Sequence, residues 1–132
     1  MLLEIDHHSG VPIYRQVMRQ IRQQIVTDGL RPGDQVEPVR ELAGHLKVNP
    51  MTISKAYAFL EAEGLLERRR GVGLFVAEVQ KDRQEEIKTE LLSQTMDKAA
   101  VTAIQLGLSE DEAVEFLRKH YSEYSLKGER QR

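Results

Sequence analysis

Residues 36–76 read VEPVRELAGHLKVNPMTISKAYAFLEAEGLLERRRGVGLFV, and this stretch decides the fold. Apolar residues recur in it at helical spacing over two segments, which predicts two short helices with one apolar face each. Asn49 and Pro50 open the second helix, because asparagine is a good N-cap and proline suits the first helical position. Gly64 lies just past its end, where glycine is favoured. We therefore predict a helix-turn-helix at about residues 38–57.

A basic hairpin is predicted at about residues 65–77. Leu65-Leu66 and Phe75-Val76 are expected on two strands, joined by the sequence R-R-R-G-V-G. Glycine lets the backbone approach a phosphate or a groove edge closely, and the three arginines supply positive charge. A hairpin of this kind beside a helix-turn-helix is typical of a wing.

Candidate DNA contacts gather at the start of the second helix and on the wing. The N-terminal end of a recognition helix enters the major groove, and its free N–H groups favour a phosphate. Arg40 is expected beside the DNA backbone, with an ion pair to Glu37 or Glu41 as the alternative. Met51 is expected to be exposed rather than a buried gap-filler. The candidate DNA-binding residues are Arg40, Asn49, Met51, Thr52, Ser54, Lys55, Arg69, Arg70, Gly71 and Gly73.

Several motifs in fixed order resemble the winged helix-turn-helix of the GntR family of bacterial transcription regulators. They are G-L-R-P-G-D, V-R-E-L-A, V-N-P-M-T-I, A-Y-A-F-L-E-A-E-G-L-L and R-G-V-G-L-F-V, within about residues 11–77. The resemblance implies sequence-specific binding of double-stranded DNA and a DNA contact by Arg40. The chain departs from the family pattern at Glu37-Pro38, where Pro-Ser is usual, and at Lys47, where Gly is common. Many relatives also carry Arg at one or both of the positions of Pro50 and Ser54, so the departures bear on the base sequence recognised.

The chain after residue 78 is predicted to form two helices. Ser109 and Glu112 form a capping box that opens the second of them. Two helices with broad apolar faces cannot bury both faces against each other alone. They either pack on the same pair in a second chain or fold back on their own winged domain, and we favour the dimer because such regulators need two half-sites. The expected dimer contacts are Ile87, Leu91, Met96, Ala99, Ala103, Val114, Leu117 and Tyr121.

The predicted fold class is mainly α with a small β-hairpin wing. We expect a winged helix-turn-helix DNA-binding domain at residues 1–78 and an α-helical dimerisation tail at residues 79–132. The short tail resembles the YtrA-like subfamily, which implies a homodimeric repressor at a palindromic operator, with a transporter operon as the implied target. A bound dimer blocks polymerase without any catalytic group. The sequence leaves open whether a small-molecule effector acts.

Composition restricts the other classes of function. The chain has 132 residues, with 19 Lys and Arg against 21 Asp and Glu, so DNA binding must rest on local placement of charge. It has no cysteine, no signal peptide and no apolar run long enough for a membrane span, so a cytoplasmic protein without a membrane partner is expected. His7-His8 lacks further ligands at suitable spacing, so no metal site is expected.

Two competing functions are weighed against DNA binding. An enzyme is disfavoured because His45 and His120 have no nucleophile or carboxylate constellation that the sequence identifies, and no cofactor is expected. A winged-helix protein-interaction module without DNA binding is the alternative function. The basic wing disfavours it, because a protein-binding surface would be more apolar.

Overall fold

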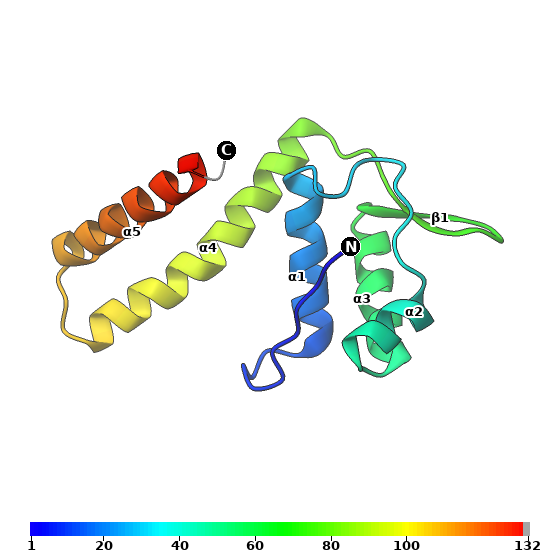
Figure 1. Cartoon of the computed structure of the whole chain (residues 1–132), viewed down its shortest axis with the longest axis horizontal. Coiled ribbons are helices and arrows are strands. Elements are labelled where there is room, and N and C mark those ends of the chain that lie inside the picture. Colours follow the sequence, from blue (N-terminus) through cyan, green and yellow to red (C-terminus); the bar gives the residue numbers. More distant parts are fainter. Residues whose placement is uncertain (131–132) are drawn as a thin grey trace. The chain divides into compact units, whose positions relative to one another are not determined.

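The computed structural model describes residues 1–130, and their contacts divide the chain into two compact units. The first unit is Met1–Leu91, and the second starts at Leu92. Helices dominate, and the described strands form one two-stranded antiparallel hairpin, which confirms the predicted mainly helical fold with a wing (Figure 1). In chain order the elements are α1 (Ile13–Val26), α2 (Val39–Leu46), α3 (Pro50–Ala62), β1 (Leu66–Arg69), β2 (Gly73–Val76), α4 (Lys81–Gln105) and α5 (Glu110–Arg130).

Three helices of the first unit pack around one apolar core. α3 contacts both α1 and α2, which makes it the centre of the helix-turn-helix. The apolar positions that recur at helical spacing are also the buried ones, so periodicity and burial agree. Complete burial of such a side chain contributes about 1.5–3 kcal/mol. The helical core residues are Val17, Ile21, Ile25 and Val26 of α1, Leu42 and Ala43 of α2, and Ile53, Ala56, Tyr57 and Leu60 of α3.

A residue with a positive φ, in the left-handed region, follows each helix of the helix-turn-helix. Gly64 lies just past α3 with a φ of 79°, as the sequence predicts. Lys47 follows α2 with φ 56° and ψ 48°, and the N–H of Val48 then donates to the carbonyl of Ala43 at 3.0 Å. A side chain makes this backbone conformation costly, by about 1–2 kcal/mol. Lys47 therefore holds a conformation that glycine adopts with less strain.

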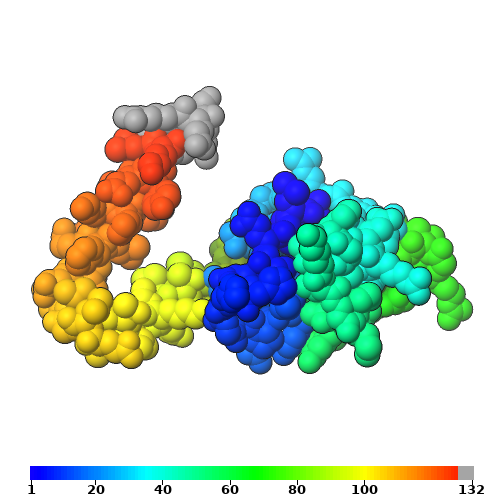
Figure 2. Space-filling view, turned by 60° about the horizontal axis from the view of Figure 1, so that its bottom comes forward, coloured from blue at the N-terminus to red at the C-terminus, as the bar shows by residue number. Residues whose placement is uncertain are grey.

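The wing has a shorter loop than the sequence suggested. Leu66 pairs with Val76 at the base of the hairpin, and Arg69 pairs with Gly73 at its outer end. Two of the three arginines therefore lie on β1, and the loop comprises residues 70–72. The wing projects from the helices in both views (Figures 1 and 2).

The segment before α2 pairs with the second edge of β2. The N–H of Val36 donates to the carbonyl of Leu74 at 3.0 Å, and the N–H of Val76 donates to the carbonyl of Asp34 at 2.8 Å. Gln35 forms an antiparallel bridge with Phe75. β2 is thus flanked on both sides, and this pairing fixes the wing to the chain that enters the helix-turn-helix.

Three glutamines of α1 hold an extended N-terminal arm, residues 1–6. Gln16, Gln20 and Gln24 are four residues apart, so their side chains lie on one side of the helix. Gln20 bonds both backbone groups of Glu4, because its Nε2 donates to the carbonyl at 2.6 Å and its Oε1 accepts from the N–H at 2.8 Å. Gln16 bonds Asp6 in the same way, and Gln24 donates to the carbonyl of Leu2. This glutamine ladder replaces the strand partner that an extended segment would otherwise need.

The start of α4 belongs to the first unit, which reaches beyond the boundary expected at residue 78. Ile87 is 0% exposed and Leu91 is 9% exposed, and both lie in the core of that unit. Their assignment to the dimer interface is therefore corrected, because the chain's own winged unit already covers them. An apolar stripe on a helix shows that the face is buried without showing what buries it.

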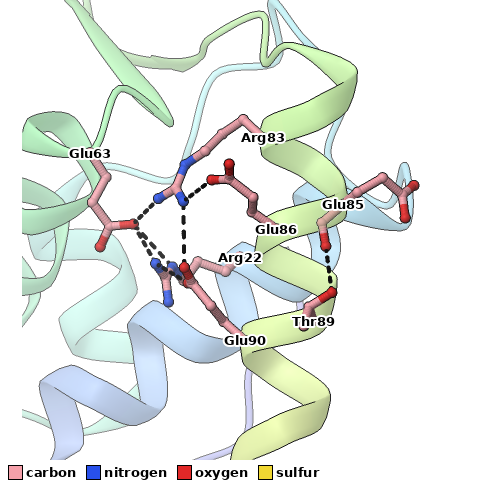
Figure 3. A network of polar contacts seen from close by, with 7 residues as sticks. All are labelled: Arg22, Glu63, Arg83, Glu85, Glu86, Thr89 and Glu90. Atoms are coloured by element: carbon pink, nitrogen blue, oxygen red, sulfur yellow. Dashed lines mark hydrogen bonds and ion pairs between the residues drawn. The ribbon is translucent and has the colours of Figure 1, made fainter.

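An ion-pair network fastens this part of α4 to the winged fold (Figure 3). The guanidinium of Arg22 on α1 contacts Glu63, just past α3, at 2.7 Å and Glu90 on α4 at 3.3 Å. Arg83 on α4 contacts Glu86 at 3.2 Å, Glu90 at 3.5 Å and Glu63 at 3.7 Å. The side chain of Arg22 is only 15% exposed, so its charge depends on these partners.

The second unit contains the rest of α4 and α5. Gly107, with a φ of 76°, follows α4. The predicted capping box opens α5: the N–H of Glu112 donates to Ser109 Oγ at 3.1 Å, and the N–H of Ser109 donates to the Glu112 carboxylate at 3.1 Å. Both signals are local in sequence, so each helix boundary follows from its own residues.

Large apolar side chains of the second unit are exposed. None of the side chains described between residues 92 and 127 is buried. Figure 2 shows α5, in orange and red, diverging from the yellow end of α4. Ile104 is 74% exposed and Tyr121 is 72% exposed. Of the other expected dimer contacts, Met96, Ala99, Val114 and Leu117 are exposed and Ala103 is half-buried.

Candidate nucleic-acid interface

The start of α3 is built as the sequence predicts. The side chain of Asn49 accepts a hydrogen bond from the N–H of Met51 at 2.9 Å, and Pro50 occupies the first helical turn. Met51 is 77% exposed, which confirms the expectation that it is not a buried gap-filler. Thr52 is half-buried, and Ser54 is exposed. The first turn of α3 therefore presents a small surface that is both polar and apolar.

Arg40 is exposed on the first turn of α2. The alternative to a DNA contact was an ion pair with Glu37 or Glu41. Glu37 pairs instead with Nδ1 of His45, and Arg40 makes no ion pair within the described part of the chain. Its guanidinium is therefore available to a phosphate.

The three arginines of the wing differ in their surroundings. Arg68 contacts the Glu61 carboxylate at 3.2 Å, which draws it toward α3. The guanidinium of Arg69 lies 4.0 Å from the centroid of the Phe75 ring, in cation–π geometry. Arg70, in the loop, is exposed and has neither an ion pair nor a ring contact among residues 1–130. Arg70 is thus the wing cation least committed to the protein itself.

Both glycines of the wing have a backbone conformation that other residues rarely adopt. Gly71 has a φ of 78° in the turn where the N–H of Val72 donates to the carbonyl of Arg69 at 3.0 Å. Gly73 has a φ of 141°, and a Cβ there would lie 2.8 Å from Nε2 of Gln35. Because Nε2 is the end of a flexible side chain that can move aside, the backbone conformation is the main reason for glycine at this position.

Two residues that the sequence did not single out support this interface. Nε2 of Gln35 donates to the carbonyl of Val72 at 3.1 Å, so Gln35 holds the wing loop from the side. The ring of Tyr14 on α1 stacks on Phe59 and lies 4.2 Å from the ammonium of Lys55. Lys55 is thereby held toward α1. Both contacts join segments far apart in the sequence, so no local pattern indicates them.

A cleft of about 290 Å³ separates α3 from the wing. Ser54 and Tyr57 line it from α3, and Arg68 and Val72 line it from the wing. The Tyr57 hydroxyl donates to the carbonyl of Glu37 at 2.6 Å, which ties α3 to the segment before α2. The ion pair between Arg68 and Glu61 joins α3 to the wing beside this cleft, so the cleft separates the two elements only in part.

Within the part of the chain that the structure describes, no group of three or more His, Cys, Asp and Glu side chains is placed to hold a metal ion. None of its helices is long and apolar enough to cross a membrane.

Comparisons with known proteins show which family this chain is similar to. Residues 13–76 match the sequence profile of the gntR family of bacterial regulatory proteins. The chain is 32% identical over 118 residues to the HTH-type transcriptional repressor YtrA of Bacillus subtilis (strain 168), covering 89% of this chain and 91% of that protein. A GntR family transcriptional regulator from Listeria monocytogenes superposes with a TM-score of 0.72 at 33% identity, over 87% of this chain and 98% of that one. YtrA from Sulfolobus acidocaldarius, a GntR-family transcription factor, superposes with a TM-score of 0.56 at 32% identity. The match covers 92% of this chain and 97% of that one.

Proposed function

Because this chain belongs to the GntR family and is a DNA-binding transcription regulator, we propose that it represses transcription as a homodimer on a palindromic operator. The family consists of transcription regulators rather than enzymes. A bound dimer would exclude polymerase by occupancy alone, so the proposal needs no catalytic group. The repressor assignment is supported by the relative from Bacillus subtilis, which is a repressor and matches over most of both chains.

The exposed apolar surface of the second unit is the observation that carries the dimer. Ile104, Leu117 and Tyr121 are exposed to 74%, 47% and 72%, although large apolar patches are rare on monomers. A second copy of the same two helices would cover these side chains in a twofold arrangement. We assign Met96, Ala99, Ala103, Val114, Leu117 and Tyr121 to this interface and add Ile104.

The winged unit divides DNA binding between two kinds of contact. Arg40 and Arg70 are exposed cations without partners among the described residues, which fits phosphate contacts that set register. The first turn of α3 enters the major groove in helix-turn-helix proteins, so we assign base contacts to Met51 and Ser54. Asn49, Thr52 and Lys55 support this surface, and Arg69, Gly71 and Gly73 shape the wing.

The target is proposed from the subfamily alone. The resemblance of the short tail to the YtrA-like subfamily implies a transporter operon as the regulated unit, and the similarity to the repressor YtrA supports the subfamily. A small-molecule effector would have to bind one arrangement of the dimer better than another to change DNA affinity.

Selection from a random duplex library, followed by measurement of the mass of the selected complex, tests the proposal. We expect a palindromic site that binds two chains. Arg40→Ala and Arg70→Ala should weaken binding and lower the slope of log affinity against log salt, each by about two units per dimer because each substitution removes two phosphate contacts. Lys88→Ala is the matched control, because this exposed cation of α4 pairs with Glu85 away from the recognition unit.

Three other outcomes are distinguishable. Enrichment of a single half-site bound by one chain would keep DNA binding and refute the dimer. Unchanged affinity and salt slope in both arginine variants would refute the assigned phosphate contacts. No enriched sequence at low salt would favour the protein-interaction module.

A further inference from the structure

The exposed face of α3 carries one side chain of the kind that reads bases with two hydrogen bonds, Lys55. Arginine or lysine commonly reads guanine in this way, and asparagine or glutamine reads adenine. The exposed residues over the first three turns of α3 include no arginine, asparagine or glutamine. They are Pro50, Met51, Ser54, Lys55, Ala58 and Phe59.

The two polar candidates nearest this face are already engaged. The Oδ1 atom of Asn49 accepts the N–H of Met51 as the helix cap, so its amide is not free for paired bonds to adenine. The ammonium of Lys55 lies 4.2 Å from the ring centroid of Tyr14, which holds it toward α1. Lys55 therefore contributes positive charge beside the groove and does not form paired hydrogen bonds with a base at the start of α3.

Apart from Ser54, whose hydroxyl bonds any base edge without preference, the side chains that remain at the start of α3 are apolar. Met51 is 77% exposed, which is unusual for a large unbranched apolar side chain that could otherwise fill a core. Pro50 beside it is exposed as well. In the major groove the C5-methyl group of thymine is the feature that apolar side chains recognise. Exposure of Met51 at the groove-entering turn therefore matches a thymine methyl rather than a hydrogen-bonding base edge.

We propose that Met51 is a specificity-determining residue that reads thymine through its C5-methyl group, so that each half-site of the operator carries thymine where the first turn of α3 enters the groove. This inference rests on the proposed function and specifies its DNA substrate. The preference for thymine at these positions should therefore depend on burial of its methyl group. Guanine should not be recognised there through two hydrogen bonds from one side chain.

Replacement of single thymines by deoxyuridine in the selected operator tests the proposal, because it removes only the methyl group and keeps base pairing. With the 132-residue chain, we expect roughly fourfold weaker binding for each contacted methyl, from the free energy of burying one methyl-sized group. Met51→Ala should weaken binding to the thymine duplex and should show no further loss on the deoxyuridine duplex. The two changes together form a double-mutant cycle that isolates the contact.

Val72→Ala is the matched control, because Val72 is also an exposed apolar residue of the winged unit, 60% exposed, but lies on the wing. It should keep the difference between thymine and deoxyuridine. The proposal is overturned if deoxyuridine leaves affinity unchanged at every thymine of an operator that the protein still binds, or if Met51→Ala retains the full difference. A protein that selects no DNA sequence at all overturns the proposed function itself, and this inference falls with it.

Discussion

The hydroxyl of Tyr57 donates a 2.6 Å hydrogen bond to the backbone carbonyl of Glu37, which joins the middle of α3 to the segment before α2. Burial, and after it the nearby Glu37 carboxylate, raises the pKa of Tyr57 above its ordinary value of 10.0. The folded protein therefore keeps this proton at pH values where the unfolded chain loses it. It follows that stability falls as the pH rises above about 10.

Tyr57→Phe should lower the free energy of unfolding near neutral pH by about 1–2 kcal/mol, because the carbonyl of half-buried Glu37 loses its donor. The difference between the two proteins should shrink above pH 10, since phenylalanine cannot ionise. Urea unfolding at several pH values between 8 and 11 measures both effects. A difference that stays constant over this range would show that Tyr57 does not contribute to the alkaline loss.

The glutamine ladder predicts a local effect of Gln20→Ala. The substitution removes both side-chain bonds to the backbone of Glu4, at 2.6 and 2.8 Å. Because the site is exposed, we expect a loss of only about 1 kcal/mol. The amide protons of the N-terminal arm should exchange faster with solvent while those of α3 keep their protection. Gln23→Ala, at an exposed position of the same helix, should change neither quantity.

Features of this fold that depend on neighbouring residues were predictable from the sequence, whereas contacts between distant segments were not. Asn49, Ser109 and Gly64 act on backbone groups within a few residues, so their helix boundaries were predictable. Arg22 pairs with Glu63 and Glu90, which are 41 and 68 residues away, and no pattern along the chain indicates such partners. For the same reason, no pattern along the chain distinguishes Arg22 from Arg15 and Arg19, the other arginines of α1.

In the candidate site, too, the features set by nearby residues were predictable and the long-range contacts were not. The exposure of Met51 and the start of α3 followed from the N-cap. The contact of Gln35 with the wing loop and that of Tyr14 with Lys55 depend on tertiary packing, which the sequence does not show. Ile87 continued the apolar stripe of α4, but only the folded chain shows that this end of the stripe is covered by the winged unit.

Lys47→Gly should stabilise the protein. Lys47 has a φ of 56°, where glycine is less strained, so we expect a gain of about 0.5–1 kcal/mol in the free energy of unfolding. Lys47→Ala separates this backbone effect from the loss of charge, because alanine keeps the strain and should give no gain. If Lys47 also contacts a phosphate, both variants will weaken DNA binding equally. Equal stability of Lys47→Ala and Lys47→Gly in thermal unfolding would contradict the backbone explanation.

Glu63→Gln tests the ion-pair network of Figure 3. Glu63 contacts Arg22 at 2.7 Å and Arg83 at 3.7 Å, so its neutralisation leaves a half-buried arginine with weaker compensation. We expect a loss of about 1–2 kcal/mol, smaller at high salt, and faster amide exchange in the first turns of α4. Glu85→Gln is the control, since its pair with Lys88 is exposed and contributes less than about 0.5 kcal/mol. Equal losses in both variants would show that the network does not fasten α4.

Ile104→Glu tests the proposed dimer surface. Ile104 is 74% exposed on the second unit, so a charge there costs the single chain little, whereas burial of that charge against a second copy is costly. We expect the variant to sediment as a monomer, to lose cooperative binding to a two-half-site operator and to keep binding to a single half-site. Thr102→Glu adds the same charge two residues earlier, on the opposite side of α4, and should remain dimeric. A dimer that survives Ile104→Glu but not Thr102→Glu would place the interface on the other face of the helix.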